Sequence, residues 1–423
     1  MIPTPSHHSQ ARGGSLGRVG PPQGVIILNF NTGKCDLMGN MSPQSSAPTT
    51  PPATASMVNW DLAAKTAANL APAGPSLNGS EIGRAVENLR LMAEKSVPHV
   101  HEISRLEAAR DLRDSEVLVV DRASWAKANT QSFAVMMDPI MAALAAKQSS
   151  AGKNAAAASA TVTGAQLGAA LAFLSSKVLG QYDPFAALAG QRESKENAGA
   201  ELPASGGRLL LVAPNIITVE RDLKVDPSDF RLWVCLHEQT HRVQFAAAPW
   251  LRHHMLSEIE KLGGLLVGDS ENLGERLLQA TKALASKKPA TPDVPSRGGV
   301  LDLLQNPEQK AALSHVTAVM SLLEGHANVV MDGVDQTIVP TVRTIRQRFN
   351  SRGKDRGFIE KFVRNLMGLD AKMRQYSDGA KFVREVVAIA GMDGFNNVWT
   401  QAENLPTEPE IHDARLWVDR MGL

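Results

Sequence analysis

Two histidines and a glutamate near the middle of the chain have the spacing of a metal-binding helix. They lie in the run His237-Glu238-Gln239-Thr240-His241. Residues four apart lie on one face of a helix, so both imidazoles can bind one ion at about 2.0–2.1 Å. Glu238 lies about 100° around the helix, beside the ion, where its carboxylate could accept a proton from water. The spacing predicts a zinc-dependent hydrolase with Glu238 as general base.

A catalytic zinc site takes three protein ligands and leaves one position for water, so a third ligand is required. The pattern H-E-x-x-H-x-x-G-x-x-H is excluded, because Gln244 and Ala247 occupy its last two fixed positions. A glutamate on a downstream helix is the usual alternative, and Glu324 is the best candidate. Gly325 follows it, and glycine inside a helix costs about 1 kcal/mol relative to alanine. We therefore expect another element to approach closely there.

Several neighbouring residues are weaker candidates. Asn328, one turn beyond Glu324, could bond a ligand histidine. His326 could assist substrate binding or the oxyanion, although a surface or hydrogen-bonded core histidine is the commoner situation. Tyr376 could donate to the oxyanion, but a core tyrosine is the alternative. Four further histidines lack ligand spacing and are expected at the surface: His99, His101, His253 and His254.

The helix with the motif is expected to begin at Asp226-Pro227, since aspartate caps helices and proline favours their first turn. It is expected to be buried, because it has apolar residues on several faces: Leu232, Trp233, Leu236, Val243 and Phe245. Two histidines and a glutamate are costly to bury without a ligand. The burial of this helix therefore also favours a metal.

Helical spacing of apolar residues recurs along most of the chain. The expected helices are 60–110, 124–146 with Ser124 as N-cap, 164–179, and most of the chain from 306 to the end. The expected strands are 116–121, 208–213 and 216–220. Segments 149–160, 191–207 and 286–297 are expected to be linkers or loops.

These elements predict a mainly α (α+β) fold with a small sheet wrapped by helices. Four parts are expected: a disordered tail at 1–56, an N-terminal helical lobe with a short strand at 57–160, a catalytic lobe at 161–285, and a C-terminal helical lobe with the third ligand at 286–423. Met57 directly precedes the first helical pattern. A tail and a natural start at Met57 both remain open.

Composition excludes several classes of protein. Lys+Arg 44 against Asp+Glu 43 gives a net charge of +1, which offers no field for nucleic acid or an anionic membrane. The longest apolar segment, 164–180, is too short to span a membrane. The N-terminal apolar stretch is too short for a signal peptide, and two cysteines far apart predict no disulfide framework. A cytoplasmic protein is expected.

Several short motifs together resemble the actinobacterial zincin-like metallopeptidase family, over about 60–418. They are Trp60-Asp61-Leu62, the run 162–168, Leu179-Gly180-Gln181-Tyr182-Asp183, Val212-Ala213-Pro214-Asn215, the run 236–245, and Glu324-Gly325-His326-Ala327. The resemblance implies a minimal gluzincin core wrapped in extra helices. It also implies His237, His241 and Glu324 as zinc ligands, with Glu238 as general base.

The leading hypothesis is a peptidase with one zinc ion per chain, acting on a peptide or protein. The strand at 209–212 would border the cleft and pair with extended substrate. The alternative is a non-hydrolytic zinc-binding interaction or scaffold protein, which has no need to retain Glu238. A helical scaffold without metal is the third hypothesis.

Overall fold

The structure of the chain is a computed structural model that describes residues 58–112, 115–146, 153–189, 206–268, 306–352 and 375–423. The predicted tail at 1–56, the linker at 286–297 and nearly all of the loop at 191–207 lie outside these residues.

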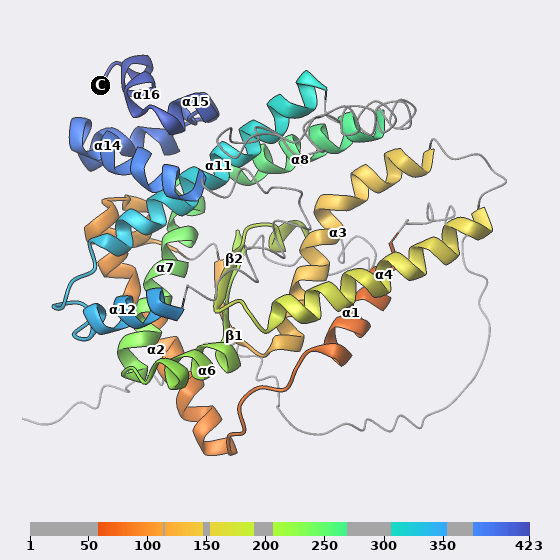
Figure 1. The fold of residues 1–423 in the computed structure, drawn as a ribbon, viewed down its shortest axis with the longest axis horizontal. Helices are drawn as coiled ribbons and strands as arrows, with labels where there is room; N and C mark the ends of the chain where they lie inside the picture. Colours follow the sequence, from red (N-terminus) through yellow and green to blue (C-terminus); the bar gives the residue numbers. More distant parts are fainter. Residues whose placement is uncertain (1–57, 113–114, 147–152, 190–205, 269–305, 353–374) are drawn as a thin grey trace, which may run out of the picture. The chain divides into compact units, whose positions relative to one another are not determined.

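The described residues form mainly helices around one small sheet (Figure 1), which confirms the predicted fold class. The helices are α1 (Trp60–Leu70), α2 (Gly79–Ser104), α3 (Arg122–Ala146), α4 (Lys153–Ser175), α6 (Ala213–Leu223), α7 (Pro227–Ala247), α8 (Leu251–Gly268), α11 (Pro307–Asp332), α12 (Val342–Arg352), α14 (Gln375–Phe395), α15 (Glu408–His412) and α16 (Ala414–Met421). Short 3-10 helices are η1 (Glu107–Arg110), η4 (Asn396–Trp399) and η5 (Ala402–Asn404). No helix in the described ranges is both long and apolar enough to cross a membrane.

The sheet has the order β1 (Ser115–Val120), β3 (Gly207–Val212), β2 (Gly180–Asp183). β1 runs parallel to β3 and β2 runs antiparallel to it. β3 is therefore the central strand, with both edges paired. The expectation that residues 209–212 pair with a substrate is wrong, because their backbone groups already bond β1 and β2. Among the described strands, β2 and β1 form the two edges.

Residues 216–220 form part of helix α6 and not the predicted strand. β3 ends at Val212, and Pro214 then occupies the first turn of the helix, where proline is well tolerated. Ile216, Val219 and Leu223 are buried at helical spacing. The branched side chains suggested a strand, but their burial on one helical face outweighed that local preference.

Two further boundaries differ from the predictions. The expected linker at 149–160 is helical from Lys153 onward. The segment contains a run of alanines, and alanine has the highest helix propensity of all residues. The N-cap of α3 is Asp121 rather than Ser124, since the Asp121 Oδ1 accepts a hydrogen bond from the Ser124 backbone N–H at 2.7 Å. Helix α3 itself ends at Ala146, as predicted.

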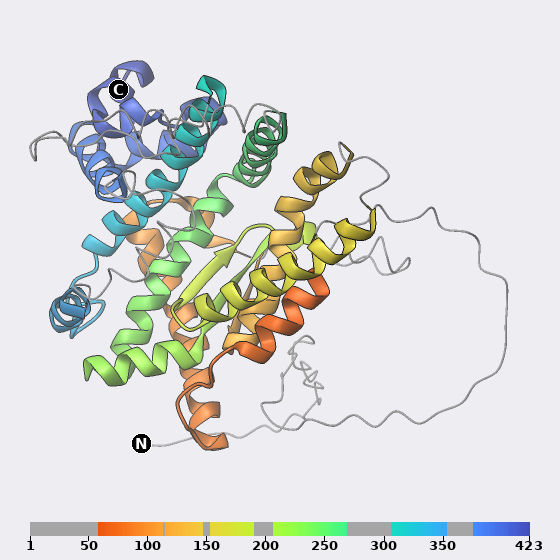
Figure 2. The ribbon, with the colours of Figure 1, turned by 45° about the vertical axis from the view of Figure 1, so that its right-hand side comes forward.

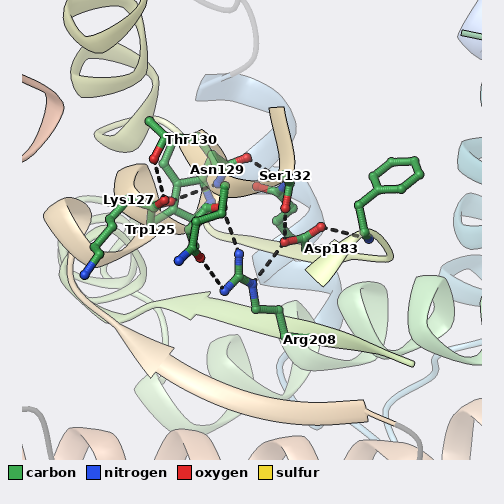
Figure 3. A network of polar contacts seen from close by, with 11 residues as sticks. Trp125, Lys127, Asn129, Thr130, Ser132, Asp183 and Arg208 are labelled. Atoms are coloured by element: carbon green, nitrogen blue, oxygen red, sulfur yellow. Dashed lines mark hydrogen bonds and ion pairs between the residues drawn. The ribbon is translucent and has the colours of Figure 1, made fainter. Parts of the chain in front are cut away.

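A buried ion pair fastens the edge strand β2 to β3 and α3 (Figure 3). Arg208 of β3 donates from Nε to Asp183 of β2 at 3.0 Å and from a terminal nitrogen to the Ala128 carbonyl at 2.8 Å. Ser132 of α3 donates to the same Asp183 carboxylate at 2.5 Å. Removing one partner of a buried ion pair lowers the free energy of unfolding by about 3–5 kcal/mol, because the other charge stays buried without a partner. The network therefore fixes where β2 lies.

Helix α7 lies beside the sheet and contacts β2, β3, α2 and α11 (Figure 2). Its buried side chains belong to the main hydrophobic core, and Phe230, Cys235, Leu236 and Val243 are fully enclosed. The predicted burial of this helix is confirmed. Any group on α7 that must reach solvent can do so only where a neighbouring element leaves a gap.

Candidate metal centre

Helix α7 begins as its sequence predicts. The Asp226 side chain accepts a hydrogen bond from the Asp229 backbone N–H at 3.0 Å, and Pro227 occupies the first turn. The cap satisfies one of the backbone donors that a helix start leaves unpaired. Within the helix, the spacing of four residues places His237 and His241 one turn apart on the same side.

Three side chains from two helices converge at this point. The imidazole rings of His237 and His241 have centroids 5.0 Å apart. Glu324 of α11 places its carboxylate oxygens 4.0 Å from His237 Nε2 and 3.6 Å from His241 Nε2. One donor atom from each residue lies within 4.8 Å of the other two, and this trio is the one metal-type cluster among the described residues. Two imidazoles and one carboxylate form a donor set that zinc accepts.

The three side chains are neither fully buried nor fully exposed. The solvent-exposed fraction of the side chain is 30% for His237, 34% for Glu324 and 14% for His241. The surrounding core still desolvates the His237 ring, which, together with the nearby His241, holds the His237 pKa below its usual value. A neutral imidazole is the form that binds a metal. The partial exposure means that solvent reaches all three side chains.

Close contact between two helices places Glu324. A side-chain carbon at Gly325 would lie 2.3 Å from the Gly379 backbone carbon of α14, and one at Gly379 would lie 2.0 Å from the Ser321 carbonyl oxygen. Neither position accepts a larger residue unless the helices separate. The approach expected from Gly325 is therefore confirmed, and α14 holds the part of α11 that presents Glu324.

Gln244, which the sequence analysis used only to exclude one ligand pattern, connects the two ligand helices. Its amide nitrogen donates to the Leu323 carbonyl at 2.9 Å and lies 3.0 Å from His326 Nδ1. Its amide oxygen lies 3.0 Å from His241 Nδ1. The carbonyl can only accept, so the amide nitrogen must face Leu323 and the oxygen must face His241. His241 Nδ1 then has the proton, and its Nε2 is free for a metal.

His326 is a core residue. Its ring is fully buried, stacks on Phe395 and meets Trp399 at a tilt of 58°, with centroids 5.3 Å from each. Burial, aided by the nearby His241, lowers the pKa of His326 to about 3, so the ring is neutral. Its position favours the core alternative over a direct part in the oxyanion. Its Nδ1 atom contacts the amide nitrogen of Gln244, and the amide oxygen of Gln244 contacts His241.

Glu238 is buried against the edge strand. A side-chain carbon at Gly180 of β2 would lie 2.6 Å from Glu238 Cγ, so only glycine leaves room for the carboxylate there. The side chain is 8% exposed. Desolvation, and then the charge of Glu324, raise the pKa of Glu238 to about 8. A cation held by the neighbouring ligands would oppose that rise and favour the carboxylate.

The sequence suggests two other candidates, Asn328 and Tyr376. Asn328 is exposed on α11, and the partner of His241 Nδ1 is Gln244. Tyr376 is in the first turn of α14, but its side chain lies outside the described residues. His237, His241, Glu324 and Glu238 are thus the predicted residues that come together. The signal for Gln244 was its position three residues after His241, on the same face.

Two histidines and a buried glutamate on one helix, with a carboxylate from a second helix, define a zincin-type metal centre. A match to the zincin-like metallopeptidase family spans residues 58–418, and the chain belongs to this family. The match confirms the zincin-like metallopeptidase family expected from the sequence motifs, and it covers the whole expected range of about 60–418.

The chain is also similar to a solved structure. This is the crystal structure of an inferred hydrolase with a novel fold from Chloroflexus aurantiacus, with a TM-score of 0.58 and 28% identity, covering 86% of this chain and 99% of that chain. No curated protein matches the sequence.

Proposed function

We propose that this chain is a zinc-dependent peptidase of the gluzincin type. His237, His241 and Glu324 would hold one zinc ion, and Glu238 would be the general base. The observation that carries the proposal is the convergence of the three donor atoms within 4.8 Å, with Glu238 adjacent on the same helix. Membership of a metallopeptidase family supports a peptide or protein as substrate.

Zinc in such a site polarises a carbonyl and makes water acidic near neutral pH. The Glu238 carboxylate accepts one proton from water as the water oxygen forms its bond to the carbonyl carbon of the substrate. Glu238 then gives that proton to the amide nitrogen, the C–N bond breaks, and a carboxylic acid and an amine leave. Burial and the charge of Glu324 raise the pKa of Glu238, and a bound zinc ion would lower it again. These opposing effects would let the carboxylate take up and release a proton near neutral pH.

The substrate would bind along the outer edge of β2. The inner edge of β2 pairs with β3, and Gly180 lies against Glu238. An extended peptide added to this edge would bring a backbone carbonyl beside the candidate metal and base. The Asp183–Arg208 ion pair would keep the strand in place as the substrate binds.

The substitution Glu238→Gln tests the proposal. It removes the base and keeps the shape and the three ligands. We expect the zinc content of the purified protein, measured by elemental analysis, to stay unchanged. Hydrolysis of a substrate found by peptide-library screening should fall at least about 100-fold, since general base catalysis contributes about 10²- to 10⁴-fold.

The matched control is Glu94→Gln, an exposed glutamate on α2, which should hydrolyse the substrate at the wild-type rate. Wild-type turnover by a zinc-loaded Glu238→Gln protein would rule out Glu238 as the base. Zinc binding without hydrolysis of any peptide by the wild type would favour the non-hydrolytic scaffold.

A further inference from the structure

A second group of metal-type side chains lies between α8 and α11. His254 of α8 and His315 of α11 point their rings at each other, with the two Nε2 atoms 2.8 Å apart and the ring planes at 82°. The sequence predicts surface positions for both His253 and His254. His253 is exposed, as expected, whereas His254 is half-buried against a histidine distant in sequence. Sequence spacing could not reveal a pair contributed by two helices.

Carboxylates surround this histidine pair. Glu258 lies one turn after His254 on α8, and it lines the same cavity of 530 Å³ as both histidines. Glu308 and Glu403 also line this cavity, whereas Lys261 is its one lysine. Three carboxylates against one ammonium group favour a cation over an anion. The two imidazoles narrow the choice to a transition metal, because imidazole suits zinc, copper, iron and nickel.

At least one of the two rings has an unprotonated Nε2, the form of nitrogen that binds a metal. Desolvation lowers the pKa of His315, and the nearby His254 acts in the same direction, against the charge of Glu258. Protonation of both rings would place two positive charges in contact. The 2.8 Å contact between the two Nε2 atoms requires one of them to be unprotonated, and a metal ion beside the pair would bind the lone pairs of both nitrogens.

This pair is separate from the candidate zinc centre. His315 precedes Glu324 on α11 by about two and a half turns, on the order of 13 Å along the axis. Two and a half turns also place the two residues on opposite faces of the helix. A metal ion at His254 and His315 could therefore not share ligands with one at Glu324.

We propose that His254 and His315 form a second transition-metal site that joins α8 to α11, with Glu258 as the third ligand. Among the described residues, the one set of three metal-type side chains whose ligand atoms lie within 4.8 Å of one another is that of the first centre. Glu258 must therefore turn its side chain to reach an ion at the second site. The inference goes beyond the proposed peptidase activity and does not depend on it.

The spacing of the two nitrogens favours particular metals. Ligands about 2.0–2.1 Å from an ion lie about 2.9 Å apart at a right angle, and about 3.4 Å apart in a tetrahedron. The observed 2.8 Å therefore fits adjacent positions in an octahedral or square-planar shell. Nickel and copper adopt these geometries, whereas zinc in proteins is usually tetrahedral.

Nickel binding by the full chain tests this site. The protein is stripped with a chelator, given one equivalent of zinc, and titrated with Ni²⁺ by calorimetry. We expect the wild type to bind one Ni²⁺ ion. The variants His254→Ala and His315→Ala should each bind Ni²⁺ at least tenfold more weakly. The control His253→Ala alters the exposed neighbour on the same helix and should bind Ni²⁺ as the wild type does. The adjacent His7 and His8 are present in every variant and contribute equally.

Thermal melting in chelator, recorded before each titration, shows whether the variants fold, and His315→Gln replaces any variant that does not. Added Ni²⁺ should raise the melting temperature of the zinc-loaded wild type and of His253→Ala, but not that of the other two. Unchanged Ni²⁺ affinity in both His254→Ala and His315→Ala would overturn the proposal. The pair would then be an imidazole–imidazole hydrogen bond. Neither result changes what Glu238→Gln shows about hydrolysis.

Discussion

Gln244 gives His241 the tautomer that a metal needs. The Leu323 carbonyl orients the amide, the amide oxygen accepts the Nδ1 proton of His241, and Nε2 faces Glu324. Because Leu323 directly precedes Glu324, the same amide also ties Glu324, the proposed third ligand, to α7. One buried side chain therefore orients one proposed ligand and positions the helix turn of another.

Replacing Gln244 with leucine should weaken zinc binding about 10- to 100-fold, the usual effect of removing a group that orients a ligand. The variant Gln244→Glu keeps an acceptor for His241 but places its second oxygen against the Leu323 carbonyl, so its zinc affinity should lie between those of the leucine variant and the wild type. Competition with a chromophoric chelator measures both affinities. Equal affinity of the leucine variant and the wild type would mean that packing alone orients His241.

Single residues differ in how far the sequence could predict them. His237, Glu238 and His241 follow from spacing on one helix, because such geometry is local. Glu324 required a guess about which distant helix approaches, and the Gly325 signal supported that guess. The role of Gln244 could not be predicted, since it depends on Leu323 and His326, which only the fold brings near.

Between elements, the contact of α11 with α14 is the one most directly tied to the site. Gly325 and Gly379 allow the two backbones to touch beside Glu324. Backbone atoms cannot move aside as the end of a flexible side chain can. A methyl group at either glycine must therefore push the helices apart.

The variant Gly325→Ala should lower the free energy of unfolding by about 2–3 kcal/mol, because overpacking outweighs the gain in helix propensity of about 1 kcal/mol. It should also weaken zinc binding, since Glu324 moves with the helix. The control is Gly83→Ala in α2, where a side chain meets nothing within 4 Å. That variant should be more stable by about 0.5–1 kcal/mol in urea unfolding. Similar effects of the two substitutions would show that α11 and α14 separate at little cost.

A second element-scale prediction concerns the joint of α15 and α16. Arg420 donates to both oxygens of Glu410, at 2.6 and 3.1 Å, and the Thr407 backbone N–H donates at 2.8 Å. Burial raises the pKa of Glu410, but these hydrogen bonds outweigh it and leave the pKa below the usual 4.5. A lowered pKa in the folded state stabilises the protein above pH 4.5, and the benefit is lost as pH falls through the folded-state pKa.

The variant Glu410→Gln should therefore be less stable than the wild type by about 2 kcal/mol at pH 7, since hydrogen bonds to a charged group contribute about 1.5–3 kcal/mol. Urea unfolding as a function of pH measures the difference, which should shrink as pH falls below 4.5. Glu385→Gln, which alters an exposed pair with Lys381 at 3.7 Å, should change stability little at any pH. A difference that stays constant with pH would mean that the Glu410 charge contributes nothing.

The errors at the element scale have a common physical cause. The branched residues of 216–220 have a strand preference, yet Pro214 and burial on one face make them helical. The alanines of 153–160 resemble a low-complexity linker, yet α4 packs on α1 and continues through them. The position of β3 in the centre of the sheet is set by pairings with strands that are distant in sequence. Tertiary contacts, which no local pattern contains, decided each case.

At the scale of the whole chain, the first described residues, 58–60, contact the interior of the domain. Val58 is buried, the Asn59 side chain caps α1 through the Leu62 N–H, and Trp60 donates to Asp138 of α3 at 2.8 Å. The family match also begins at residue 58. The contacts of residues 58–60 with α3 and α4 join the start of the family domain to its interior.

A chain that starts at Met57 should therefore retain the melting temperature and zinc content of the full chain, because the proline-, serine- and glycine-rich sequence before it has too few apolar residues to contribute to a core. The matched truncation starts at Leu62 and also removes Val58, the Asn59 cap and the Trp60 hydrogen bond. Loss of the cap alone costs about 1 kcal/mol, and loss of a buried apolar side chain adds about 1.5–3 kcal/mol, so this shorter chain should melt at a clearly lower temperature. Differential scanning calorimetry of the three proteins at equal zinc provides the comparison. A lower melting temperature for the chain that starts at Met57 would show that residues 1–56 stabilise the fold, and the predicted tail would be wrong.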